Sequence, residues 1–124
     1  MGSGVTFWGR TGHPDSEDAL RFLKHNRYAA DQVLDILRQP PTTDDLAKLA
    51  KGLGGLWPLV DPKSPDVARL LPQGEATPPD TLRDALAALP GLLRAPILLT
   101  PKGAVAGFRE QKWRAFLDIG KGRS

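Results

Sequence analysis

The prediction of the fold starts from the stretch Val5-Thr6-Phe7-Trp8-Gly9. Its β-branched and aromatic residues, ended by a glycine, predict a short buried β-strand with Trp8 inside. Pro14 fits the first turn of a following helix, where its missing N–H costs nothing. The helix is expected to stop near Asn26 and to pack on a sheet through an i, i+3, i+4 stripe of apolar residues. That stripe consists of Ala19, Phe22 and Leu23.

A second strand is predicted within residues 28–36, strongest at Gln32–Asp35. Thr42 or Thr43 then caps a helix whose apolar face is Leu46, Leu49, Ala50 and Leu53. Glycine is a common helix stop, so three glycines are expected to end this helix. They are Gly52, Gly54 and Gly55.

Residues 56–89 are rich in proline, glycine and helical patterns. Two short helices are expected there, one opening at Ser64-Pro65 and one at Asp80. Ile97–Thr100 and Ala104–Gly107 predict a hairpin with a glycine at its turn. A last helix, from about Arg109 to Asp118, would cover it. The order β-α-β, helices, β-β-α predicts a mixed α/β sheet with a right-handed parallel crossover at its start.

Four segments resemble, in order and spacing, those of the arsenate reductase (ArsC)/Spx family. They are Thr6-Phe7-Trp8-Gly9, Pro40-Pro41-Thr42-Thr43-Asp44-Asp45-Leu46, Leu92-Leu93-Arg94-Ala95-Pro96-Ile97 and Gly107-Phe108-Arg109-Glu110-Gln111-Lys112-Trp113. This resemblance implies a thioredoxin-like fold with a four-stranded mixed sheet. It also implies one domain over residues 1–124, a helical insertion at about 43–89, and a cis peptide bond before Pro96.

The resemblance also implies a cysteine nucleophile at the start of the first helix, where unpaired N–H groups and the helix dipole stabilise a thiolate. Here that position falls on His13, and the second cysteine of some members falls on Ser16. The chain contains no cysteine at all. Neither thiol chemistry nor a disulfide cycle is therefore expected, and no catalytic residue is assigned.

Arginines that bind the oxyanion in the family's reductases are implied at three further positions. They are occupied here by Ala95, by about Lys63, and by Phe108. Arg94 adjoins the first and should point away if its segment is extended. Lysine cannot make the bidentate grip of arginine on an oxyanion. The remaining candidates for binding are Arg10, Thr11, Gly12, His13, Lys63, Arg94 and Pro96, with Lys112 as a further anion contact.

Two residues have two interpretations each. His13 is either a neutral imidazole available for acid–base work or a residue that merely flanks the helix. Trp57 is either an interface anchor or part of a lid that packs on the core. His13 and His25 stand at opposite ends of one helix, so a shared metal is not expected. Neither a metal nor a cofactor is expected elsewhere.

Composition limits the partners. The formal net charge is only +3, and the basic tail Lys121-Gly122-Arg123 is short. Aromatic residues are not interleaved with basic ones as on a nucleic-acid platform, so no direct nucleic-acid binding is expected. No apolar run is long enough for a membrane span, and no secretory signal is visible, which favours the cytoplasm.

Two classes of function follow. The first is a non-catalytic binding or regulatory protein with a protein partner, since the resemblance includes Spx-type regulators of transcription. The second is an enzyme with an altered site of the arsenate reductase, glutathione-dependent oxidoreductase or transferase type, which binds a small anion or glutathione. The missing cysteine favours the first class.

Overall fold

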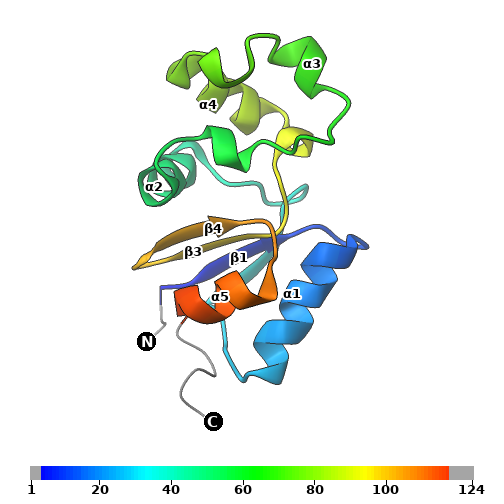
Figure 1. Cartoon of the computed structure of the whole chain (residues 1–124), viewed down its shortest axis with the longest axis vertical. Helices are drawn as coiled ribbons and strands as arrows, with labels where there is room; N and C mark the ends of the chain where they lie inside the picture. Colours follow the sequence, from blue (N-terminus) through cyan, green and yellow to red (C-terminus); the bar gives the residue numbers. More distant parts are fainter. Residues whose placement is uncertain (1–3, 118–124) are drawn as a thin grey trace.

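The computed structural model describes residues 4–117 and contains a four-stranded mixed sheet with helices on both faces (Figure 1). Helices α1 and α5 lie on one face, and α2, α3 and α4 lie beyond the other. The predicted mixed sheet is confirmed. The strands are β1 (Thr6–Gly9), β2 (Gln32–Asp35), β3 (Ile97–Thr100) and β4 (Gly103–Ala106); the α-helices are α1 (Pro14–His25), α2 (Thr43–Leu53), α3 (Val67–Leu70), α4 (Pro79–Ala88) and α5 (Glu110–Leu117); the 3₁₀ helices are η1 (Trp57–Leu59), η2 (Gly74–Ala76) and η3 (Pro90–Leu92).

Strand β1 lies inside the sheet, whose order is β2-β1-β3-β4. It pairs in parallel with β2, through α1 as the crossover, and antiparallel with β3. Strands β3 and β4 form the predicted hairpin. β4 begins at Gly103, one residue before the expected start, because Gly103 already pairs with Thr100.

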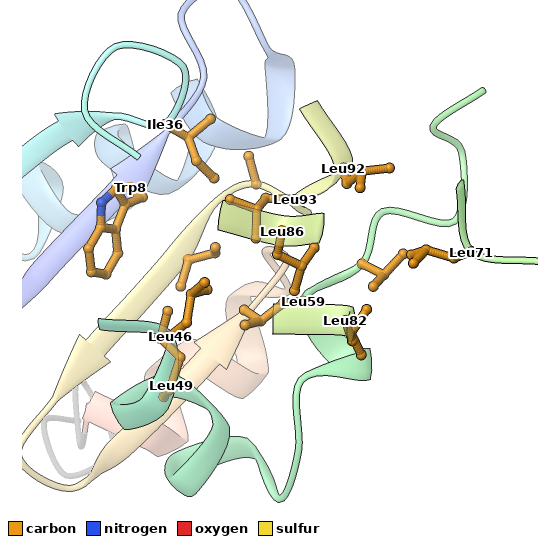
Figure 2. Packing of buried hydrophobic residues seen from close by; sticks show 14 residues of the cluster. Trp8, Ile36, Leu46, Leu49, Leu59, Leu71, Leu82, Leu86, Leu92 and Leu93 are labelled. Atoms are coloured by element: carbon orange, nitrogen blue, oxygen red, sulfur yellow. The ribbon is translucent and has the colours of Figure 1, made fainter. Parts of the chain in front are cut away.

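Successive side chains of β1 enter two separate cores, as the two-residue period of a strand requires. Phe7 packs with residues of α1, α5 and β3, including Phe22, Trp113 and Leu98. Trp8 packs in a larger core on the other face with residues of α2, α4 and the loops around them (Figure 2). Both aromatic side chains are buried, as expected for Trp8.

Local signals set the starts of the two longest helices. Thr42 caps α2 with a complete capping box, because its side chain accepts from the Asp45 N–H and the Asp45 carboxylate accepts from the Thr42 N–H. In α1, His13 is the cap and Pro14 the first helical residue. The peptide bond between Ala95 and Pro96 is cis, as predicted.

The prediction that Gly52 ends α2 is wrong. The helix continues to Leu53, and its cap is Gly54 in the left-handed region at φ 80°. Gly52 instead lies where α2 crosses β4, and a Cβ atom added to it would sit 2.7 Å from the backbone nitrogen of Ala104. The last helix is described to Leu117, so its expected end at Asp118 and the basic tail lie outside the described residues.

Of the two interpretations of Trp57, the structure supports packing on the core. Its half-buried ring packs against the larger core, and the neighbouring Leu59 is fully buried. Among the described residues, the large exposed apolar side chains are Leu20, Val33, Leu37 and Leu89, none of them within 52–63. An interface built on Trp57 is therefore not supported. No helix in the described part of the chain is long and apolar enough to cross a bilayer.

Gly52→Ala is expected to destabilise the protein, although alanine is the better helix former by about 1 kcal/mol. The new methyl group would overlap the backbone of β4, and forced repacking costs about 1–3 kcal/mol. Urea unfolding followed by circular dichroism measures the change. Gly91→Ala is the control, because a Cβ atom there meets nothing within 4 Å. A Gly52→Ala protein as stable as the parent would contradict this account of the crossing.

Candidate functional site

The loop between β1 and α1 is closed by a small hydrogen-bond network around His13. The Ser16 backbone N–H donates to His13 Nδ1 at 3.3 Å, which satisfies one of the free N–H groups of the helix start. The Ser16 hydroxyl lies 3.0 Å from the same ring nitrogen. Because Nδ1 accepts from the backbone, the hydroxyl donates to it and the ring carries its proton on Nε2.

Ser16 is also held from the other side. Its Oγ accepts from the Arg10 N–H at 2.9 Å, and the residue is 2% exposed. A hydroxyl so placed cannot reach a substrate. The positions that the resemblance assigns to two cysteines are thus occupied by a helix cap and by the buried residue that supports it.

A backbone ladder between two distant segments brings the cationic residues together. Val60 and Leu93 form an isolated antiparallel bridge. The Arg94 N–H donates to the Leu59 carbonyl at 2.7 Å, and the Asp61 N–H donates to the Leu92 carbonyl at 2.8 Å. The Asp61 carboxylate then accepts from the Lys63 N–H at 2.9 Å and shapes the turn that carries Lys63.

A cleft of about 360 Å³ opens between this ladder, the start of α1 and the start of α5. Four cationic side chains and two carboxylates line it, so its charge is positive when His13 is neutral. None of the four cations forms an ion pair with any described residue. The charged and titratable lining residues are His13, Asp15, Asp61, Lys63, Arg94, Arg109 and Lys112.

The expectation that Arg94 points away from the site is wrong. Its side chain lines the cleft and lies against Gly107, where an added Cβ atom would be 3.3 Å from Arg94 Cδ. Arg94 Nε is buried without a hydrogen-bond partner among the described residues. This N–H donor therefore remains unsatisfied within the described residues.

Phe108 cannot serve as an anion ligand, because its ring belongs to the aromatic part of the smaller core. It packs edge-on against Trp113, with 5.1 Å between the ring centroids, and in a tilted arrangement against Phe22, with 5.6 Å between the centroids. The Trp113 indole N–H also donates to the Gly107 carbonyl at 2.9 Å, which holds the turn before α5. Arg109 and Lys112 follow that turn.

The structure thus brings together three of the residues selected from the sequence, His13, Lys63 and Arg94, with Lys112 beside them. Arg109 and Asp61 were missed. Both stand next to selected positions, since Arg109 follows Phe108 and Asp61 opens the segment that carries Lys63, but only the fold turns them into one cleft. Pro96 is buried, and its carbonyl accepts from the Gly107 N–H at 2.8 Å.

Arg10, Thr11 and Gly12 do not join this cleft. They line a second cavity of about 310 Å³ between α1 and β2. Arg10 Nε and Nη2 are buried there without a partner among the described residues. The Thr11 hydroxyl donates to the Asp35 carboxylate and ties the loop to the end of β2. Residues 4–117 contain no group of three or more His, Asp or Glu side chains arranged to hold a metal ion.

Comparison with known proteins identifies relatives of this chain. No family model matches the sequence. The global transcriptional regulator Spx 1 of Lactococcus lactis subsp. lactis is 33% identical over 97 residues, which span 77% of this chain and 69% of that protein. The chain belongs to the ArsC/Spx family.

Solved structures of ArsC-type proteins share the fold. An arsenate reductase from Vibrio cholerae is 21% identical with a TM-score of 0.78, over 96% of this chain and 99% of that one. An ArsC-family-related protein from Bacteroides fragilis is 17% identical with a TM-score of 0.79, over 90% and 97% of the two chains. A protein assigned as an arsenate reductase in Yersinia pestis is 25% identical with a TM-score of 0.75, over 93% and 99%. This ArsC/Spx member therefore has the family's thioredoxin-like fold without any cysteine.

The hydrogen bond from the Thr11 hydroxyl is expected to lower the pKa of the Asp35 carboxyl group. Hydrogen bonds from Thr11, above all, and from the Leu37 and Arg38 backbone hold the pKa of Asp35 below its usual value. Thr11→Ala should therefore raise the pKa of Asp35, as measured by carboxyl NMR titration. Because the pKa is lowered in the folded state, this stabilisation is present above the unfolded pKa of about 3.9 and is lost as the pH falls through the folded value.

The control for that titration is Thr81→Ala, an exposed threonine on α4 far from β2. The same Asp35 pKa in Thr11→Ala and in the parent would show that the backbone N–H donors alone set it.

Proposed function

We propose that this chain is a non-reducing member of the ArsC/Spx family that acts as a binding or regulatory protein. The observation that carries the proposal is the site of the missing nucleophile. His13 occupies that site, and its Nδ1 is engaged as the cap of α1. With no cysteine anywhere in the chain, no thiolate can attack arsenate or a disulfide.

The cleft beside His13 supports a binding role. Lys63, Arg94, Arg109 and Lys112 converge there without ion-pair partners among the described residues. A positive cleft attracts anionic groups and favours negatively charged partners. We propose that a protein partner presents the anionic group. The relative from Lactococcus lactis is a global transcriptional regulator by name, so a transcription-related role is the form that we propose for such regulation.

The alternative is an enzyme with an altered site, in which a small thiol such as glutathione supplies the nucleophile. The observation that favours it is the same cleft, because glutathione and small oxyanions are negatively charged and the cleft is positive. The two proposals differ in what they require. The enzyme needs a small anion to bind at the cleft and to turn over there, whereas the binding protein needs no turnover.

Reductase activity is expected to be at background in coupled assays with the glutathione/glutaredoxin and thioredoxin systems. The physical reason is the absence of a thiol. Arsenate or disulfide turnover that depends on the protein would refute the proposal. A cysteine-containing ArsC reductase run in parallel is the positive control.

His13→Cys is expected to produce one thiol that reacts with an alkylating dye, because the helix start stabilises a thiolate. Arsenate reduction by this variant should still be poor, since Ala95 and Phe108 stand where the family resemblance implies arginines. The parent protein, which has no thiol, is the control for labelling. Efficient reduction by His13→Cys would instead show that Arg94 and Arg109 replace the lost arginines.

A thermal-shift screen with glutathione, phosphate, sulfate and arsenate separates the two proposals. A ligand at about ten times its Kd adds about 1.4 kcal/mol to the stability, which raises the Tm of a domain this size by about 5 °C. We expect no such shift with glutathione. A glutathione shift that Arg94→Gln abolishes and Lys48→Gln retains would favour the enzyme, because Lys48 is an exposed cation on α2 outside the cleft.

A further inference from the structure

Two adjoining apolar cavities, of about 710 Å³ and about 310 Å³, lie on the face of the protein between α1 and the edge strand β2, and together they form one groove. Val33 of β2 is the partner of Phe7 in β1, so both side chains point to the α1 face of the sheet. Phe7 is covered by α1 and α5, whereas Val33 remains 55% exposed. Leu20 on α1 flanks the groove and is 38% exposed. Helix α1 therefore leaves the outer strand of the sheet uncovered.

The groove also lies beside a sheet edge. Strand β2 is terminal in the order β2-β1-β3-β4 and pairs only with β1 among the described strands. Sheet edges with exposed apolar side chains are natural sites of association, and proteins usually protect them. Here Val33 stands at the middle of the edge without a covering element.

Charge is distributed unequally along the groove. The half beyond Leu20 and Val33 toward the end of α1 is lined by three cations and no carboxylate; these are Arg21, Lys24 and Arg27. Arg21 pairs with Asp18 at 2.9 Å, and the other two form no ion pair with a described residue. The half toward the start of α1 is lined by the carboxylates of Glu17 and Asp35 and by one cation, Arg10, so its lining is acidic on balance. Leu20 and Val33 line both halves and mark the centre.

We infer that this groove is the interface of a homodimer, with a second copy of the chain as its occupant. A two-fold axis near Leu20 and Val33 places the two α1 helices antiparallel and the two β2 edges side by side. The apolar centre of one copy then packs against the apolar centre of the other, and the cationic half of each copy faces the acidic half of its mate. Such self-complementarity is the condition for an isologous two-fold interface. In this arrangement Lys24 of each copy approaches Glu17 of its mate, which gives two such contacts per dimer.

The charge pattern argues against a uniformly acidic or basic partner, because either would meet like charges in one half of the groove. A second copy places the two carboxylates of each chain opposite the cations of the other. The interface shares no lining residue with the cleft at His13. Failure of one proposal therefore leaves the other untouched.

Sedimentation velocity of the full chain from about 10 µM to about 1 mM tests the inference, a range that detects even a weak dimer. The dimer should weaken at high salt, because exposed charges are screened. Glu17→Lys and Lys24→Glu should each raise the dimer Kd by about tenfold or more, since each change replaces two attractive contacts by two repulsive ones. Val33→Lys should abolish the dimer.

Two combinations of these variants test whether Glu17 of one copy pairs with Lys24 of the other. The double variant Glu17→Lys/Lys24→Glu should recover the parent Kd to within about threefold, because it exchanges the two charges. An equimolar mixture of the two single variants should form a heterodimer, detected by native mass spectrometry, although neither forms a strong homodimer. Asp44→Lys, Lys48→Glu and Leu89→Lys are controls at exposed positions away from the groove and should leave the Kd unchanged. Thermal melts of every variant confirm folding.

The inference is overturned if the parent chain is monomeric at about 1 mM and low salt, a concentration at which even a Kd of about 1 mM gives a measurable dimer fraction. A monomer would leave a different protein as the occupant of the groove. It is also overturned if the dimer survives Val33→Lys or if the double variant fails to restore association, since either result places the interface elsewhere.

Discussion

The position of β1 inside the sheet is the constraint on which the rest of the structure depends. Its two aromatic residues point in opposite directions, with Phe7 in the smaller core and Trp8 in the larger one. Full burial of side chains of this size stabilises a fold by about 2–3 kcal/mol each. Because β1 also pairs with both β2 and β3, one short strand fixes the parallel crossover, the hairpin and both helical layers in relation to one another.

The cleft beside His13 forms because the helical segment returns to that sheet at one place. The chain leaves β2, forms α2 through α4, and meets itself again where residues 59–61 bond to residues 92–94. This ladder carries Lys63 and Arg94 to the same side as the start of α1. The turn at Gly107, held by the Trp113 indole, carries Arg109 and Lys112 to the opposite wall. Four cations from three distant segments therefore converge, and none of them forms an ion pair with a carboxylate of residues 4–117.

At the position that the family resemblance assigns to a cysteine, His13 caps the start of α1. A helix N-terminus stabilises a negative charge or a side chain that accepts its free N–H groups. His13 meets the second condition through a neutral ring nitrogen, and Ser16 closes the network by joining that ring to the Arg10 backbone. The site is thus well satisfied without a thiolate.

The sequence by itself determined the main elements and the absence of thiol chemistry. β-Branched and aromatic residues followed by a glycine placed β1, and Pro14 and Thr42 placed the helix starts. The missing cysteine excluded thiol catalysis. Each of these depends on neighbouring residues or on composition alone. Only the tertiary structure decided the direction of Arg94, the role of Gly52 and the exposure of Val33. Arg94 turns into the cleft because its backbone bonds to Leu59 and its stem lies on Gly107; Gly52 is required where a helix crosses β4; Val33 is exposed because α1 stops short of the sheet edge. Each depends on contacts between segments far apart in the chain, which local patterns do not encode.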